Sequence, residues 1–353
     1  MVSFQRNQGV ALITVLVIFS VLSIMAIQIL NSQQMQVQRT ANIINGSRAY
    51  QYMYGAEVFA TSQLKKFFEE SKAERVHRLQ PWSESGLAFE IEQGLGQLQG
   101  SIKDMHSCFN INSIIMEQQA AGDGGEEGRE IGSGGNGLQP VSEGRVNDGS
   151  EGSGMPGVDI FAKLIESRLE DSSVSPQALA VATKDWIDED QEPTGIDGAE
   201  DYTYTGMKIP YRTADSFMAH SSELLVIKGF TPEIYDQIKD LVCVLPTKEG
   251  TINVNTVEPE NAELVWMLLQ DVDLGQVRQA LENLPDEGYD EAGFFEALGS
   301  GKVSKQGKGR LVFDSKYMLL TAEASVNTGK AVVSSLMLKQ DSEFNVIARH
   351  IGE

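Results

Sequence analysis

The sequence predicts an α+β fold in which a long N-terminal helix packs on an antiparallel sheet and a large, mostly helical insertion separates the strands. Two observations lead to this fold class. Residues 10 to about 72 contain no proline and place apolar residues at helical spacing. Alternation of apolar and polar residues, typical of strands, appears at residues 87–103 and again after residue 309. The segments between these two regions have helical periodicity.

The first part of the long helix is the apolar stretch Val10–Leu30, with the sequence VALITVLVIFSVLSIMAIQIL. No charged residue occurs between Arg6 and Arg39. About 20 apolar residues are enough for a helix to cross a bilayer. A buried helix of a soluble protein is the alternative, but such helices normally have a polar face. We therefore expect a membrane segment.

The leader MVSFQRNQG, residues 1–9, indicates which kind of membrane segment this is. No A-x-A cleavage site of a secretory signal follows Leu30, and the change from polar to apolar residues falls between Gly9 and Val10. A basic leader that ends in Gly before an apolar helix resembles the prepilin signal of type IV pilins and type II secretion pseudopilins. The resemblance implies cleavage after Gly9 by the prepilin peptidase. It also implies that the helix, then starting at Val10, lies first in the membrane and later in a filament core.

Thr14 would be the fifth residue of the mature chain, where most pilin-like subunits have Glu. A carboxylate in an apolar core is costly unless it is paired, and a subunit with no subunit ahead of it has no partner for that Glu. The missing Glu resembles the K-type minor pseudopilins, general secretion pathway protein K. This resemblance implies a place at the tip of a short periplasmic filament and the minor pseudopilins I, J and H as partners. A membrane anchor unrelated to pilins is the alternative.

Charge and composition agree with an extracytoplasmic structural protein. The chain has 353 residues and a net charge of −22, which disfavours nucleic acid and anionic lipid as main partners. Arg6 is the cation nearest to the apolar stretch. The positive-inside rule therefore places the N-terminus in the cytoplasm and the bulk of this single-pass inner-membrane protein in the periplasm.

The expected domain organisation follows the changes in periodicity. The K-type pseudopilins resemble this pattern, because they look like a pilin fold with a large helical insertion. The expected parts are the leader 1–9, the transmembrane or filament-core helix 10–30, the remaining helix and the first sheet strand or strands in 31–108, the helical insertion 109–308 with a Gly-rich mobile loop 121–157, and the C-terminal antiparallel strands 309–353.

The sequence has no recognisable catalytic constellation, so we expect a protein that is not an enzyme. The four histidines are scattered and no H-E-x-x-H or G-x-S-x-G motif occurs. Residues Ser222–Thr231 resemble a helix-hairpin-helix module, which binds DNA phosphates through a Gly turn. Its surroundings are acidic rather than basic. A membrane-anchored nucleic-acid-binding protein of a competence-like system is therefore kept only as the alternative function.

An acidic loop after Trp186 contains alternating carboxylates with Gly and Thr between them, an arrangement that lets several oxygens turn toward one Ca²⁺ ion. From the residues alone, a solvated acidic loop is as good an interpretation as a metal site. Residues 186–201 also resemble the calcium-binding segment of K-type pseudopilins, and the resemblance implies a Ca²⁺ site. The expected ligands are Asp188, Asp190, Asp197, Glu200 and Asp201.

The two cysteines, Cys108 and Cys243, are expected to form a disulfide, because the periplasm is oxidising. Two buried free thiols are the alternative.

Overall fold

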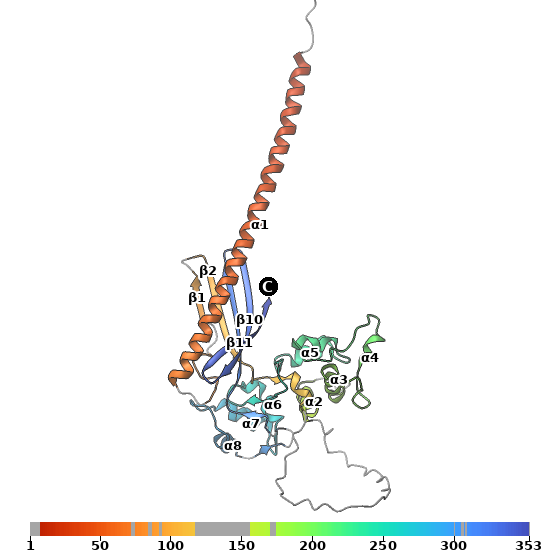
Figure 1. Cartoon of the computed structure of the whole chain (residues 1–353), viewed down its shortest axis with the longest axis vertical. Coiled ribbons are helices and arrows are strands. Elements are labelled where there is room, and N and C mark those ends of the chain that lie inside the picture. Colours follow the sequence, from red (N-terminus) through yellow and green to blue (C-terminus); the bar gives the residue numbers. More distant parts are fainter. Residues whose placement is uncertain are drawn as a thin grey trace, which may run out of the picture. The chain divides into compact units, whose positions relative to one another are not determined.

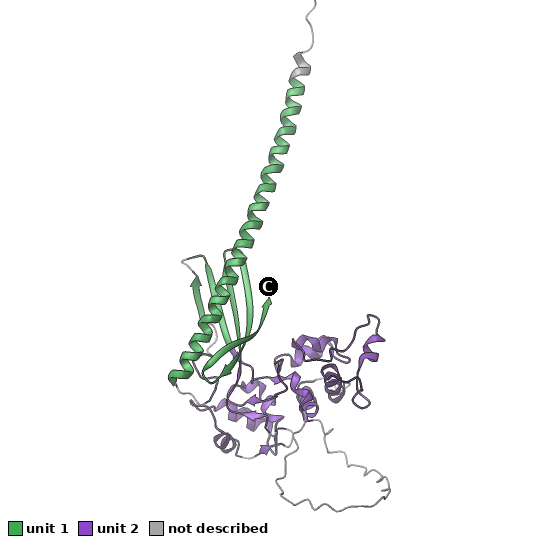
Figure 2. Ribbon diagram, viewed as in Figure 1, with its two compact units in different colours: residues 1–71, 82–102, 319–353 green, residues 72–81, 103–318 purple. Residues whose placement is uncertain are grey.

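A computed structural model of the chain describes residues 8–71, 75–83, 87–91, 94–116, 156–169, 174–299, 301–304, 307 and 309–352 (Figure 1). These residues form two compact units (Figure 2). Unit 1 comprises residues 1–71, 82–102 and 319–353, and unit 2 comprises residues 72–81 and 103–318. Unit 2 therefore contains more residues than the expected insertion, 109–308. It also includes residues 72–81, directly after the long helix.

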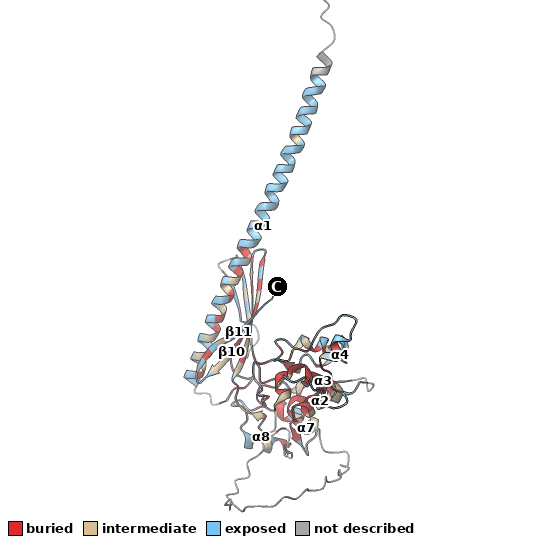
Figure 3. Ribbon diagram, turned by 45° about the vertical axis from the view of Figure 1, so that its right-hand side comes forward, coloured by how far each residue is buried: buried red, intermediate tan, exposed pale blue. Residues whose placement is uncertain are grey.

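Unit 1 is built on the single helix α1 (Gln8–Ser71), which has 64 residues and starts two residues before the expected Val10. The C-terminal part of α1 buries one side chain every three or four residues, the spacing that keeps them on one face. This stripe consists of Asn45, Ala49, Met53, Glu57, Ala60, Leu64 and Phe68. Residues 12–44 of α1 are exposed, apart from the half-buried Ser23 (Figure 3).

The stripe packs on a five-stranded sheet with the strand order β1-β2-β9-β10-β11. The strands are β1 (Leu87–Ile91), β2 (Gly96–Asp104), β9 (Tyr317–Val326), β10 (Gly329–Gln340) and β11 (Glu343–Gly352). The three C-terminal strands were expected, but the single strand expected at residues 87–103 is two strands. Gly94 separates them, because its φ of 85° is a left-handed conformation that turns the chain.

The turn between β9 and β10 contacts α1 directly. Thr328 Oγ1 donates a hydrogen bond of 2.7 Å to Asn42 Oδ1 and accepts one of 3.3 Å from Asn45 Nδ2. A Cβ atom on Gly329 would lie 2.4 Å from the carbonyl carbon of Asn45. Only glycine therefore lets the turn approach the helix this closely, and the contact marks the place where α1 leaves the sheet.

An ion pair joins the buried Glu57 of α1 to Arg349 of the edge strand β11, whose side chain is 42% exposed. Arg349 donates two hydrogen bonds of 2.7 Å to the two carboxylate oxygens of Glu57, and Ser335 Oγ donates a third, of 2.8 Å, to Oε2. The hydrogen bond from Arg349 is the main cause that lowers the pKa of Glu57 below its usual value of 4.5, against the opposite effect of burial. The Glu57 carboxylate is thus kept charged inside the packed face of α1.

We expect Arg349→Met to lower the free energy of unfolding by about 2 kcal/mol at pH 7, because Glu57 keeps a buried charge without its cation. Since the folded-state pKa of Glu57 lies below 4.5, the ion pair stabilises above that pH and its contribution is lost as the pH falls further. The difference between the variant and the unmutated protein should therefore shrink in acid. Thermal unfolding at pH 7 and pH 3.5 measures it.

Lys65→Met is the matched control, because Lys65 and its partner Glu343 are 39% and 60% exposed. A solvent-exposed ion pair stabilises by less than about 1 kcal/mol. The two pairs differ in the carboxylate, because Glu57 is 8% exposed and Glu343 60%. An Arg349→Met variant that is no less stable than the Lys65→Met control would contradict the role given to the buried Glu57.

Unit 2 consists of short helices and two-residue strands. Its helices are α2 (Pro156–Arg168), α3 (Pro176–Ile187), α4 (Asp201–Thr205), α5 (Pro232–Ile238), α6 (Glu263–Trp266), α7 (Leu274–Glu282) and α8 (Glu291–Leu298), with 3₁₀ turns η1 (Ile111–Ile115), η2 (Ser221–Val226) and η3 (Pro259–Asn261). Its strands are β3 (Phe109–Asn110), β4 (Val242–Cys243), β5 (Ile252–Asn253), β6 (Leu269–Gln270), β7 (Lys302–Val303) and β8 (Leu311–Val312).

The helical character expected for the insertion is present. α2 begins at Pro156, inside the range 121–157 that was expected to be a mobile loop. Residues 121–155 of that loop, like residues 1–7 of the leader, lie outside the described residues. Pro156 starts the helix because proline is tolerated in a first helical turn, where its missing N–H is not needed.

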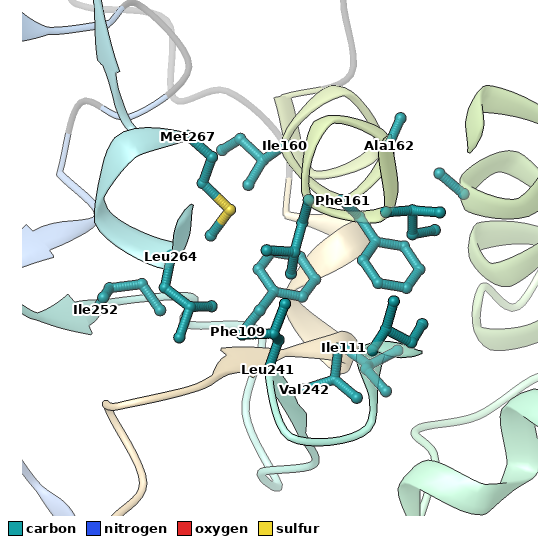
Figure 4. Packing of buried hydrophobic residues seen from close by; sticks show 14 of the residues in the cluster. Phe109, Ile111, Ile160, Phe161, Ala162, Leu241, Val242, Ile252, Leu264 and Met267 are labelled. Atoms are coloured by element: carbon teal, nitrogen blue, oxygen red, sulfur yellow. The ribbon is translucent and has the colours of Figure 1, made fainter. Parts of the chain in front are cut away.

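The core of unit 2 is centred on two stacked aromatic rings. Phe109 of β3 and Phe161 of α2 lie with their centroids 5.2 Å apart and their planes inclined by 3°. Aliphatic side chains from several elements surround the pair, including Leu241, Leu264 and Met267 (Figure 4). These residues are far apart in the sequence, so this core forms only when the whole insertion has folded.

Cys108 and Cys243 form a disulfide within unit 2, with Cα atoms 5.7 Å apart. The parallel pairing of β3 with β4 brings the two cysteines together, because Phe109 pairs with Val242 and Asn110 with Cys243. The bond closes a loop of 135 residues. In the chain-entropy account, closing such a loop stabilises the folded state by about 5 kcal/mol.

We expect denatured, unreduced protein to contain no free thiol and reduced protein to contain two. Thiol counting with and without reductant measures this. Cys108→Ser should leave one free thiol in the unreduced sample and should melt at a lower temperature, because the loop is open in its unfolded state. Two reactive thiols in the unreduced, unmutated protein would refute the bond.

Candidate functional site

The acidic loop begins where α3 ends in unit 2. Ser175 caps the N-terminus of α3 by accepting a hydrogen bond from the backbone N–H of Ala178, and Asp188 is its C-cap residue. Trp186 in the last turn is buried and packs edge-on against Tyr204 of α4, with ring centroids 5.3 Å apart. The loop between α3 and α4 is therefore held at both ends by buried side chains.

Three carboxylates converge inside this loop. Asp185, Asp188 and Glu200 each place an oxygen within 4.8 Å of the others. Asp185 is 0% and Glu200 1% exposed. Carboxylates at this separation repel one another, and burial removes the water that would screen them. Such a cluster is stable only if protons or a cation reduce its charge.

Asp185 organises the loop around the cluster. Its carboxylate accepts hydrogen bonds from the backbone N–H of Thr194, at 3.1 and 3.2 Å to the two oxygens, and from that of Ala199, at 2.8 Å. A Cβ atom on Gly198 would lie 2.7 Å from Oδ2 of Asp185 and 2.5 Å from the backbone nitrogen of Thr194. Glycine at this position lets the loop fold tightly over the carboxylate.

The other two carboxylates keep oxygens without hydrogen bonds. Within the described part of the chain, neither oxygen of Glu200 nor Oδ1 of Asp188 has a partner, although all three atoms are buried. Burial, and secondly the charges of Asp185 and Asp188, raise the pKa of Glu200 to about 7. Burial also raises the pKa of Asp188, while its hydrogen bond from Lys184 acts in the opposite direction.

A fourth carboxylate lies close enough to influence this cluster. Asp215 has a buried Oδ1 that lacks a partner among the described residues, and its charge adds to the rise in the pKa of Glu200. Its Oδ2 accepts a hydrogen bond of 2.7 Å from Gln191. The ligand atoms that these four side chains offer are carboxylate oxygens, which Ca²⁺ and other hard divalent cations prefer. The residues present fit such an ion.

Two of the five residues expected as ligands belong to the cluster, namely Asp188 and Glu200. The other three expected ligands, Asp190, Asp197 and Asp201, lie outside the cluster. Asp190 is exposed and accepts a hydrogen bond of 2.8 Å from the backbone of Glu192. Asp197 is also exposed. Asp201 binds the backbone and hydroxyl of Thr213 and forms an ion pair with Arg212 at 3.3 Å.

Asp185 was missed because it lies inside α3 rather than in the acidic loop. Its signal in the sequence is the spacing of three residues from Asp188, which places both side chains on one side of a helix end. The contribution of Glu200 depends on the loop turning back over α3. Only the folded loop reveals that turn.

The N-terminal half of α1 is the second functional feature. Within the described residues, one helix is long and apolar enough to cross a membrane, and its most apolar window has a mean hydropathy of 2.6 with no residue buried. Gly9 and Val10, expected to flank the processing site, lie in the first turn of α1. The apolar surface of this half is covered by no element described here.

The candidate helix-hairpin-helix motif is a short 3₁₀ turn followed by α5. Gly229, with a φ of 94°, forms the turn between η2 and α5, and Glu233 and Asp236 follow on α5. Its acidic surroundings do not suit a nucleic acid, whose phosphates bind Lys and Arg side chains.

Comparisons with known proteins agree on one family. A family model described as "Type II secretion system (T2SS), protein K" matches residues 107–247. A type II secretion system protein K of Aeromonas hydrophila is 30% identical over 292 residues, which cover 82% of this chain and 80% of that protein. The protein K of Klebsiella pneumoniae is 25% identical over 350 residues, covering 98% and 97% of the two chains.

The fold has a solved counterpart. A chain in the crystal structure of the GspK-GspI-GspJ complex from the type 2 secretion system of enterotoxigenic Escherichia coli aligns with a TM-score of 0.69 and 26% identity. The alignment covers 89% of this chain and 99% of that chain. None of these comparisons supports the alternative of a nucleic-acid-binding protein. The chain belongs to the type II secretion system protein K family and is a minor pseudopilin of that secretion system.

Proposed function

We propose that this minor pseudopilin is carried at the tip of the pseudopilus, where it helps to initiate or cap the filament with the minor pseudopilins I, J and H. The observation that carries the proposal is the exposed apolar half of α1 combined with Thr14 at the fifth position after the expected cleavage site. The similar solved chain is part of a complex with GspI and GspJ, which supports these two partners in particular.

The partners would contact the exposed part of α1 beyond the membrane segment. A shallow groove runs along one face of the helix there. Its lining consists of Gln33, Gln36, Val37, Thr40, Ala41 and Ile44, of which Val37, Ala41 and Ile44 are apolar. The spacing of three and four residues matches the contact stripe of one helix on another. We propose that the long helices of the other minor subunits pack on this groove.

The maturation that we propose follows from the leader. The prepilin peptidase would cut after Gly9, and Val10 would become the N-terminus of the mature subunit. The subunit would be anchored in the inner membrane by α1, with its bulk in the periplasm, until the helix moves into the filament. The exposed apolar half of α1 supports both states, because a lipid bilayer and a core of packed helices both remove it from water.

The function is tested at Thr14. We expect Thr14→Glu to reduce secretion and co-purification with subunits I and J, since a carboxylate without a partner in an apolar core costs several kcal/mol. Thr14→Val, which has the same shape without a charge, should behave like the unmutated protein. The assay is secretion by a deletion strain complemented with each variant.

A Thr14→Glu variant that supports normal secretion would contradict the tip position. Loss of secretion by both variants to the same degree would show that the charge is not the cause.

We further propose that Asp185, Asp188 and Glu200 bind one divalent cation, Ca²⁺ in preference to Mg²⁺. The buried Glu200 oxygens without hydrogen bonds support the site, and the all-oxygen donor set supports a hard cation. Mg²⁺ is the poorer fit, because it demands a tighter octahedron and keeps its waters. The bound ion would supply the positive charge that these carboxylates lack, and it would order the loop between α3 and α4.

Full-length protein in detergent should melt at a higher temperature in Ca²⁺ than in chelator. At a hundredfold excess over the dissociation constant, a ligand stabilises the folded state by about 2.7 kcal/mol. Glu200→Gln should abolish most of the shift and should itself melt higher in chelator, because it removes a buried charge.

Asp197→Asn is the matched control, since Asp197 lies in the same loop but is exposed. It should keep the full effect of Ca²⁺. Equal melting temperatures of the unmutated protein in Ca²⁺ and chelator would leave the loop as an acidic surface without a metal. If Asp197→Asn loses the Ca²⁺-induced rise in melting temperature and Glu200→Gln keeps it, the exposed residues of the loop bind the ion instead of the cluster.

A further inference from the structure

Lys184 is the cationic residue that contacts the acid cluster, which consists of Asp185, Asp188 and Glu200. It lies one helical turn before Asp188 on α3, and its Nζ atom donates hydrogen bonds to Oδ2 of Asp188 and, at 3.0 Å, to Oγ1 of Thr194. Its side chain is 20% exposed and that of Asp188 13%. The lysine thus holds both ends of the loop segment 188–194 while its ammonium group stays near the protein surface.

The charges of the cluster are only partly balanced by this lysine. Within the described part of the chain, Lys184 is the only basic residue in an ion pair with Asp185, Asp188 or Glu200. Arg212, the other cation bonded to this region, pairs with Asp201 outside the cluster. One positive charge therefore faces three carboxylates, and it contacts only one of them.

The position of Lys184 conflicts with a bound divalent cation. A metal ion that takes Asp188 as a ligand comes within a few ångströms of the ammonium group, and two cations at that separation repel each other strongly where solvent is partly excluded. The flexible four-carbon stem of lysine and its partial exposure give the ammonium group a way out to water. Its departure also breaks its hydrogen bond with Thr194.

We propose that Lys184 is a tethered counter-ion of the cluster, which a divalent cation displaces, and that it sets the affinity of the site. The inference rests on the cation site proposed above. In the metal-free protein the lysine holds the loop closed over the carboxylates. When the metal binds, its attraction to the carboxylates is partly offset by the cost of displacing Lys184. The site therefore binds the metal more weakly than the same three carboxylates would in the absence of Lys184.

The test compares calcium titrations by calorimetry, and melting temperatures in chelator, for full-length protein in detergent. Lys184→Met should lower the dissociation constant for Ca²⁺ by about tenfold, because the competing charge is gone. It should also lower the melting temperature in chelator, because Asp188 loses its ion-pair partner. The shift in melting temperature on adding Ca²⁺ should accordingly widen.

Three further variants separate charge from other effects. Lys184→Arg keeps the charge and should bind Ca²⁺ within about twofold of the unmutated protein. Lys239→Met removes a lysine of an exposed ion pair elsewhere in unit 2, where Lys239 is 46% exposed, and should change neither quantity. Thr194→Val removes the second anchor of Lys184 but no charge and should lower the dissociation constant by about threefold. This variant serves if Lys184→Met does not fold without metal.

Each outcome distinguishes the inference from the cation site itself. Calcium binding by the unmutated protein that is unchanged or weakened in Lys184→Met overturns the role of Lys184 and leaves the site standing. A weakened affinity would make the lysine a positioning residue for Asp188. Absence of calcium binding by the unmutated protein overturns both proposals.

Discussion

Unit 1 depends on one constraint, which is that the stripe of α1 between Asn45 and Phe68 must be covered by the sheet. β10 and β11 supply most of that cover, and both come from the end of the chain. The insertion connects β2 to β9, which are neighbours in the sheet. It therefore does not interrupt the packing of the sheet on α1. The backbone of Met105 donates a hydrogen bond of 2.9 Å to the carbonyl of Tyr317, so the two ends of the excursion lie side by side. A whole domain can therefore be carried between two adjacent strands.

The same helix has two different environments along its length. Where the sheet covers it, α1 buries Glu57, and Arg349 and Ser335 satisfy that charge. Within α1 no charged residue occurs before Arg39, and the apolar side chains from Leu12 to Leu30 are exposed. Exposing these apolar side chains to water is unfavourable, so the first half of the helix is more stable in an apolar environment. In the function proposed above, the surroundings of this half would change from lipid to neighbouring subunits.

The acid cluster of unit 2 shows the opposite use of charge. Asp185, Asp188 and Glu200 are held close together by a loop that Gly198 allows to fold tightly, and Lys184 balances only one of them. The raised pKa of Glu200, about 7, is a consequence of that burial and proximity. A cluster of this kind stores unfavourable electrostatic energy that a cation can release. In the cation site proposed above, binding of the ion and folding of the α3–α4 loop would be coupled.

Features that depend on local periodicity follow from the order of residues along the chain. The long helix, the strands β9 to β11, most helices of the insertion and the apolar segment for the membrane all follow from spacings of two or three to four residues, and the leader and Thr14 indicated the pseudopilin family. Tertiary structure alone decided which carboxylates meet. Asp185 is one turn of helix before the acidic loop, and its contact with Glu200 exists only because the chain turns back at Gly198. It also decided that residues 87–103 form two strands rather than one, and that β3 pairs with β4 so that Cys108 meets Cys243. These outcomes depend on side-chain directions and long-range pairing, which hydrophobic period does not encode.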